Sequence, residues 1–320
     1  MQKIIDLRKG HPKARCLPHA RLARASRAAA LRLDEATEQG FRLNYTIGGA
    51  GTPRFFSMLT EFLSSQYRSP CFAEGLFTTN GVSHGLDIAC GALCKPGDTV
   101  LMEEPSYFLV KQIFDDHHLK VVGVPSDKHG INTEALDARL ASGALTPPPK
   151  LLYLVPSHGN PRGTSLPLER REHLVQLAQR YGFYILCDDV YHMLDWSAGA
   201  AAATAAPPRI LELDPAFKAR VAKGLDWVPP APAAAADAAA GAVAAAGGGD
   251  DWDDDPVYAA AGGSGAADAA AEAEAEGHVL SIGSFTKILA PGLRLGWIET
   301  SARQRAPAHT VTEWMPGEVG

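Results

Sequence analysis

Short apolar runs alternate along this chain with longer segments in which apolar residues recur at helical spacing. Six of the runs are rich in β-branched or aromatic residues and are bounded by turn residues, which predicts buried strands. They are Leu76–Thr79, Thr99–Glu103, Lys120–Val124, Leu151–Val155, Phe183–Cys187 and Val279–Ile282. Two of the intervening segments, 84–93 and 168–181, predict helices. This alternation predicts an α/β fold with three layers (α/β/α) and a mostly parallel central sheet.

Residues 198–276 interrupt this alternation with Ala and Gly tracts and an acidic run between Asp250 and Asp255. Such a composition buries too little apolar surface to offset the entropy of ordering, which predicts a long disordered insertion. Ala-rich helix is the alternative, limited by the glycines at 247–249. Two islands, 208–215 and 217–228, retain apolar residues and are expected to pack on the core.

The net charge of -6 is unevenly distributed along the chain. Residues 198–276 hold 13 acidic and 4 basic residues, which leaves 23 acidic and 26 basic residues in the remainder. The acidic total predicts no nucleic-acid partner, and the slightly basic remainder suits an anionic ligand. No apolar run approaches the roughly 20 residues that span a bilayer, so no membrane association is expected.

The cysteines indicate a reducing compartment. There are five of them, widely spaced and never in a C-x-x-C pattern, so neither a disulfide framework nor a zinc site is predicted. We expect a cytoplasmic protein. An organelle stays open, because the first 32 residues are basic like a transit peptide, although they lack its Ser-rich bias.

Polar residues follow several predicted strands, at the sheet edge where ligands of parallel sheets bind. The segment Ser284–Lys287 is followed by Arg294, so a lysine with neighbouring hydroxyls and an arginine stands at the mouth of a buried strand. This arrangement indicates an anionic ligand. A partly desolvated amine near other cations is a nucleophile for an aldehyde, which makes Lys287 a candidate Schiff-base lysine. A solvated lysine at a strand end is the alternative.

Three further post-strand segments carry candidate ligand-binding residues. A buried Asp188 facing a pyridine nitrogen would keep that nitrogen protonated, and Tyr191 and Asn160 would reach the ring's phenolic oxygen. Tyr107 would stack on an aromatic ring. The alternatives are a helix cap for Asp188, loop punctuation for Asn160 and packing over the sheet edge for Tyr107.

The fifth segment, 78–85, joins a strand to a helix and offers backbone amides and hydroxyls to an anion. It also contains a G-x-S-x-G pattern centred on Ser83, which is typical of the nucleophile elbow of hydrolases. Chain order permits a triad of Ser83, Asp188 and His278. A serine hydrolase is therefore an alternative, although it leaves Lys287 and Arg294 without a role.

Three motifs together resemble the class I/II aminotransferases, pyridoxal-phosphate enzymes of fold type I, closest to the branch that handles α-aminoadipate. They are S-x-x-K-x-x-x-x-G-x-R-x-G from Ser284, N-P-x-G from Asn160 and D-x-x-Y from Asp188. Tyr45, followed by Gly49, is similar to the family's Y-x-x-x-G segment, and residues 7–12 are similar to its substrate-side loop. The resemblance covers residues 4–197 and 277–298.

The resemblance implies amino transfer between an amino acid and a 2-oxo acid through an internal aldimine on Lys287, in a homodimer. Asp188 would pair with the pyridinium nitrogen, and Asn160 and Tyr191 would hold the phenolate. The other cofactor-binding roles fall on Val82, Ser83, Ser284 and Arg294 (phosphate), Tyr107 (ring stacking) and Tyr45 (phosphate of the partner subunit), and Gly10 would lie against the substrate.

The predicted organisation has four parts. Residues 1–50 form an N-terminal arm, 51–197 with 277–300 the cofactor-binding large domain, 198–276 the insertion and 301–320 an atypical tail. In the family, a C-terminal small domain that binds the substrate α-carboxylate follows the lysine motif. We expect that domain to be missing, as in a truncated chain, which leaves open a pyridoxal-phosphate-binding protein with impaired or no catalysis.

Overall fold

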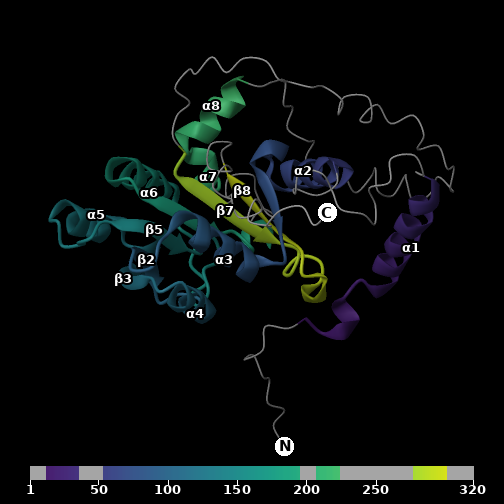
Figure 1. Ribbon diagram of the computed structural model, residues 1–320, viewed down its shortest axis with the longest axis horizontal. Helices are drawn as coiled ribbons and strands as arrows, with labels where there is room; N and C mark the ends of the chain where they lie inside the picture. The colour runs from purple at the N-terminus through teal and green to yellow at the C-terminus, as the bar shows by residue number, and fades with distance from the viewer. Residues whose placement is uncertain (1–11, 36–52, 195–206, 224–276, 301–320) are drawn as a thin grey trace, which may run out of the picture.

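The computed structural model describes residues 12–35, 53–194, 207–223 and 277–300 (Figure 1). Gly10, Tyr45, the residues after Thr300 and most of the predicted insertion lie outside the described residues. Within them, no helix is both long enough and apolar enough to cross a bilayer.

An eight-stranded sheet forms the centre of the described chain, in the order β1-β8-β7-β6-β5-β2-β3-β4. Strands β2, β3, β5, β6 and β7 pair in parallel, whereas β8 is antiparallel to both of its neighbours and β4 is antiparallel to β3. The mostly parallel sheet is confirmed. The strands are β1 (Leu76–Thr79), β2 (Thr99–Glu104), β3 (Lys120–Asp127), β4 (Gly130–Ile131), β5 (Pro149–Leu154), β6 (Tyr184–Asp188), β7 (Val279–Ser284) and β8 (Gly296–Thr300).

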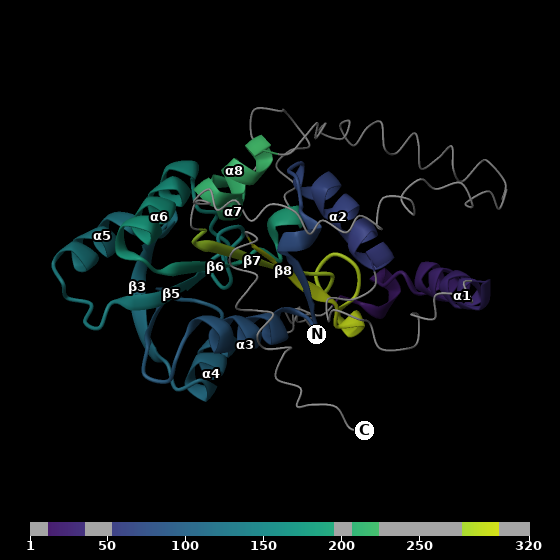
Figure 2. The ribbon, with the colours of Figure 1, turned by 45° about the horizontal axis from the view of Figure 1, so that its top comes forward.

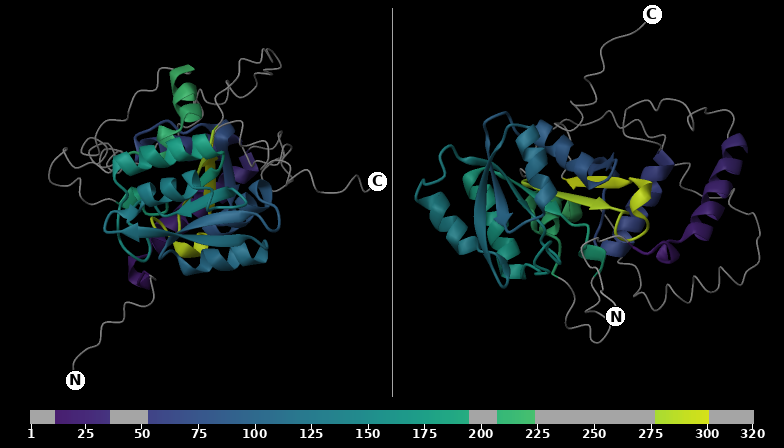
Figure 3. Two further views of the ribbon diagram at one scale, coloured as in Figure 1. Left: turned by 90° about the vertical axis from the view of Figure 1, so that its left-hand side faces the viewer. Right: turned by 90° about the horizontal axis from the view of Figure 1, so that it is seen from below.

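Helices cover both faces of the sheet and give the predicted three layers (Figures 2 and 3). On one face lie α3 (Val82–Leu93) and α4 (Phe108–Asp116), and on the other α5 (Thr133–Ala141), α6 (Leu168–Tyr181) and the short α7 (Ile210–Leu213). The remaining helices are α1 (His19–Glu35), α2 (Pro53–Tyr67) and α8 (Pro215–Lys223).

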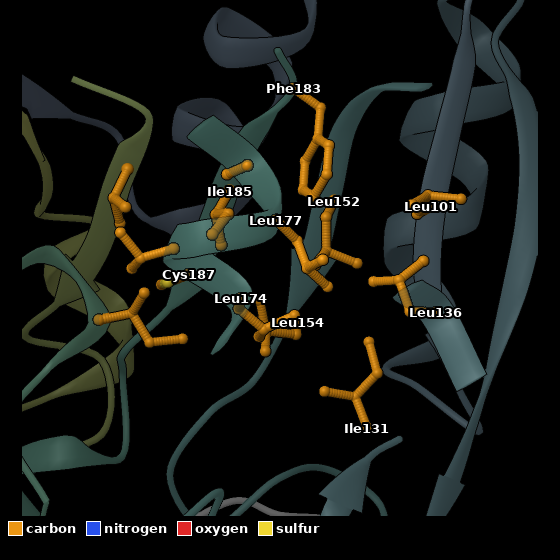
Figure 4. Packing of buried hydrophobic residues seen from close by; sticks show 14 of the residues in the cluster. Leu101, Ile131, Leu136, Leu152, Leu154, Leu174, Leu177, Phe183, Ile185 and Cys187 are labelled. Atoms are coloured by element: carbon orange, nitrogen blue, oxygen red, sulfur yellow. The ribbon is translucent and has the colours of Figure 1, made fainter. Parts of the chain in front are cut away.

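Alternate residues of each central strand enter different cores. On β5, Leu152 and Leu154 pack with α5 and α6, whereas Leu151 and Tyr153 pack with α3 and α4. Figure 4 shows the first of these cores. Because both faces are buried, the strand reads as a continuous apolar run, which explains why the sequence revealed it.

Strand β8 continues past Ile298, the last residue that the resemblance covers, to the end of the predicted large domain. Glu299 and Thr300 read as polar positions, yet both are buried in the strand. Glu299 is neutralised by Arg209, whose guanidinium has no exposed surface. At the close approach of β8 to β7, a Cβ on Gly283 would lie 2.3 Å from the Trp297 ring.

Residues 207–223 fall inside the predicted insertion, but the structure places them on the core, as expected for the two apolar islands. Ile210, Leu211 and Phe217 are buried in the cluster that also holds α6. Asp214, between α7 and α8, accepts backbone hydrogen bonds from His278 at 2.7 Å and Val279 at 2.9 Å. The range expected for the disordered insertion, 198–276, therefore includes a segment, 207–223, that packs on the core.

Candidate functional site

The site lies where β5, β6 and β7 end side by side. Because the three strands are parallel and Asp188 is in register with Ile282, the segments that follow them leave the same edge of the sheet. Lys287 Nζ lies 5.7 Å from the centre of the Tyr191 ring. An interaction with the Asn160 side chain acts to lower the pKa of Tyr191, so these two side chains lie close together. Four residues singled out from the sequence are thus brought together.

Asp188 is the buried acid of this cluster, with 5% of its surface exposed. Its Oδ2 accepts a hydrogen bond from the Tyr153 hydroxyl at 2.9 Å, whereas Oδ1 has no partner among the described residues. Burial raises the pKa of Asp188 to about 6, while the Tyr153 bond and the positive charge of Lys287 act in the opposite direction. A protonated heterocyclic nitrogen is a suitable partner for Oδ1. It would donate a hydrogen bond to this oxygen and place a positive charge beside the buried carboxylate.

Two phenols flank Asp188. Tyr107 is half-buried at the start of α4, and Tyr191 is half-buried beside Asn160. Burial raises the pKa of both phenols, and the negative charge of Asp188 adds to it, so both are neutral at physiological pH. They offer a flat apolar surface with hydroxyl donors, which suits an aromatic ring that carries an oxygen.

The N-terminus of α3 provides an anion site at the same edge. Its capping residue, Gly81, has φ 82° and no side-chain cap, so the first amides of the helix, at Val82 and Ser83, are available to a ligand. Arg294 lies against this turn: a Cβ on Gly81 would be 2.8 Å from Arg294 Nη2, which also donates to the Asn80 carbonyl at 3.3 Å. A helix N-terminus and an exposed guanidinium together fit a phosphate.

Two candidates differ from expectation. Lys287 is exposed rather than partly desolvated, because it stands on a turn that projects beyond the end of β7. The Ser284 hydroxyl is engaged within its own loop, where it donates to Thr286 Oγ1 at 2.8 Å or the Leu295 carbonyl at 3.1 Å. Its place at the end of β7 still adjoins the site, but its contacts to a ligand stay a prediction.

The hydrolase triad is wrong. His278 precedes β7, whereas Asp188 ends β6 opposite Ile282. Four strand positions separate the two residues, or roughly 13 Å. The His278 ring instead approaches the Phe183 carbonyl, with Nδ1 at 3.3 Å. A histidine at the amino end of the sheet cannot serve a serine at its carboxyl end.

Sequence reasoning missed Tyr153 and Arg171. Arg171 is fully buried on α6 and donates to the carbonyls of Pro156 at 2.9 Å and Leu166 at 2.7 Å, so it ties both ends of the loop that carries Asn160. Tyr153 interrupts an otherwise aliphatic strand, and Arg171 is a charge on the buried side of an amphipathic helix. A polar residue at an otherwise apolar position was therefore the feature of the sequence that could have identified each of them.

Comparisons with known proteins identify relatives of this chain. The aromatic-amino-acid aminotransferase 1 of Thermococcus litoralis is 25% identical over 244 residues, covering 75% of this chain and 42% of that protein. The mitochondrial kynurenine/α-aminoadipate aminotransferase of Mus musculus is 32% identical over 161 residues, covering 46% of this chain and 38% of that protein. The chain therefore spans less than half the length of these curated relatives.

A solved structure shows the same fold. The kynurenine aminotransferase of Pyrococcus horikoshii, crystallised in complex with PMP, superimposes with a TM-score of 0.59 at 21% identity, covering 95% of this chain and 58% of that one. Residues 2–225, more than half of the chain, match the family model described as aminotransferase class I and II. The chain thus belongs to the aminotransferase class I and II family.

Proposed function

We propose that this protein binds pyridoxal 5'-phosphate and transfers an amino group between an amino acid and a 2-oxo acid. The observation that carries the proposal is the buried Asp188 with one oxygen free, at the edge where Lys287, Tyr191 and Asn160 converge. The aminotransferases among the relatives support it, and their names point to aromatic amino acids or α-aminoadipate as donors.

The residues present fit the cofactor at each of its polar groups. Asp188 Oδ1 would hold the proton on the ring nitrogen, and Asn160 and Tyr191 would bind the phenolic oxygen. Arg294, Ser284 and the start of α3 would bind the phosphate, and Tyr107 would cover the ring. The cofactor, when bound, supplies the electron sink for the carbon that loses its proton. Lys287 would link to the cofactor and carry that proton.

The direct test adds pyridoxal phosphate to the purified chain and records the visible absorption spectrum. We expect a visible band from the Lys287-linked cofactor, which an amino-acid donor then removes as its oxo acid appears. A chain that shows no band contradicts the proposal. A band that no amino acid removes would instead favour a cofactor-binding protein without transamination, the alternative raised by the chain's partial coverage of its relatives.

Arg294→Lys is expected to weaken the binding of pyridoxal phosphate by about 10-fold or more, because lysine cannot reproduce the two parallel hydrogen bonds of a guanidinium to a phosphate. Pyridoxal, which lacks the phosphate, is the matched ligand control. Its affinity should change little in the same variant. Equal losses for the two ligands in a titration would place Arg294 outside the phosphate site.

A homodimer, with Tyr45 reaching the partner's cofactor and Gly10 lying against the substrate, remains part of the proposal. Both residues lie outside the described ranges. A reducing compartment such as the cytoplasm suits the five free cysteines.

A further inference from the structure

Tyr153 lies within β5, has no exposed surface and belongs to the core on the α3 and α4 side of the sheet. Its ring packs edge-on against Phe114 of α4, with the ring centres 6.1 Å apart. The hydroxyl reaches the site, where it donates its hydrogen bond to Asp188 Oδ2 at 2.9 Å. Rigid packing therefore sets the position of a donor to the buried acid.

This bond makes the two oxygens of Asp188 inequivalent. Oδ2 is engaged by the phenol, and Oδ1 is left without a partner among the described residues. A carboxylate held at one oxygen by a buried, immobile donor cannot turn freely about its last bond. Tyr153 consequently selects which oxygen is offered to a ligand.

The same bond affects the charge of Asp188. Burial disfavours the carboxylate and the neighbouring Asp189 adds repulsion, whereas the Tyr153 hydroxyl, the Val190 amide and Lys287 favour it. Loss of the hydroxyl therefore raises the pKa of Asp188 above its value of about 6 and protonates the acid near neutral pH. The titratable and charged groups that face Asp188 are Tyr107, Tyr153, Cys187, Asp189, Tyr191 and Lys287.

We infer that Tyr153 is a positioning residue, which holds Asp188 as a carboxylate with Oδ1 free for the ring nitrogen of pyridoxal phosphate. The inference rests on the proposed function and adds to it the group that keeps the acid in its working form. An acid that was already neutral would no longer favour the protonated ring nitrogen, so the phenol acts on the cofactor through Asp188.

Tyr153→Phe tests the inference, because it removes the hydroxyl and keeps the ring packed on Phe114. In the ligand-free protein, a ¹³C NMR titration of the Asp188 carboxyl, assigned with Asp188→Asn, should show its midpoint rise by about one unit or more. With ¹⁵N-labelled pyridoxal phosphate bound at pH 7, the ring nitrogen should shift toward its unprotonated form. A midpoint and a nitrogen signal equal to those of the unmodified protein would overturn the inference.

Ser281→Ala is the matched control, because it also removes a hydroxyl bond to a buried carboxylate. Ser281 Oγ donates to Asp189 Oδ2 at 2.5 Å. Its loss raises the pKa of Asp189, and a neutral Asp189 no longer repels the charge of Asp188. The Asp188 midpoint should therefore stay or fall. If the midpoint of Asp188 rose as much in Ser281→Ala as in Tyr153→Phe, the rise would reflect a general loss of packing in this region. That result would contradict a specific role for Tyr153.

Two further outcomes separate the inference from the proposed function. If the unmodified protein shows the cofactor band but Tyr153→Phe titrates normally, the inference fails and the function stands. If the unmodified protein shows no band, the function fails, and the inferred role toward the ring nitrogen is overturned with it. Should Tyr153→Phe not fold, recovery of folding in Y153F/D188N supports a defect at the unsatisfied carboxylate, and a double variant that stays unfolded contradicts it.

Discussion

Replacing Lys287 by alanine is expected to abolish the visible band of the bound cofactor and to lower the rate of amino transfer by about 10²- to 10⁴-fold. The reason is that the lysine has two tasks in the proposed site, forming the bond to the cofactor aldehyde and moving a proton. Alanine can do neither. Absorption spectroscopy reads the first task, and single-turnover kinetics with an amino-acid donor read the second.

Lys287→Arg is the matched variant, since it keeps the positive charge near Tyr191 and Asp188 but provides no group that loses a proton at physiological pH. It should be as inactive as Lys287→Ala. A second comparison is Lys111→Ala, which removes an exposed lysine of α4 paired with Asp115 and should leave both readouts unchanged. An arginine variant with near-normal rates would mean that Lys287 contributes only charge.

Replacing Arg209 by alanine is expected to lower the free energy of unfolding by about 3–5 kcal/mol, because it leaves buried acids without their counter-ion. The guanidinium has no exposed surface, binds Glu299 Oε2 at 2.5 Å and Glu212 Oε1 at 2.9 Å, and lies 3.7 Å from the centre of the Tyr67 ring. Its removal would break the ion pair that links residues 207–223 to β8. Denaturant unfolding of the two proteins measures the loss.

Lys111→Ala supplies the comparison for that measurement, since its partner is the exposed Asp115 at 2.7 Å. Solvent screens this pair, so its loss should cost no more than about 1 kcal/mol. The double variant R209M/E299L should recover part of the lost stability, because it leaves one buried charge fewer unpaired. Equal effects of Arg209→Ala and Lys111→Ala would show that the buried pair does not anchor the segment.

The elements that the sequence predicted well are those whose pattern is local. Helix α6 has the expected bounds. Strand β6 is shifted by one residue from its predicted range, and β7 is two residues longer than predicted. These strands could be located because a strand buried on both faces needs apolar residues along its whole length. Strand β8 was not predicted. Its buried Glu299 is acceptable only because Arg209 reaches it from 90 positions away, a pairing that no local window contains.

The residues of the site likewise fall into those that a local pattern predicts and those that depend on distant contacts. Four of its residues end or follow strands, so the rule that parallel strands share one functional edge was enough to group them. They are Asp188, Tyr191, Asn160 and Lys287. Tyr153 acts from inside a strand, and its hydroxyl matters only once β5 and β6 are known to be neighbours. The exposure of Lys287 depends on the shape of a turn, which spacing does not determine.

The Asp214 side chain accepts hydrogen bonds from the backbone amides of His278 and Val279. These bonds bear on how the length of the chain can change in evolution. Helix α8 starts directly after Asp214 and has nine residues, so its last residue, Lys223, lies roughly 14 Å from Asp214. Lys223 and Gly277, the described residues on either side of 224–276, therefore lie close to one place on the fold. Doubling a flexible connection with anchored ends costs only about 0.6 kcal/mol of closure entropy. Changes in the number of residues between Lys223 and Gly277 are therefore expected to cost little folding free energy, so insertions there should be tolerated.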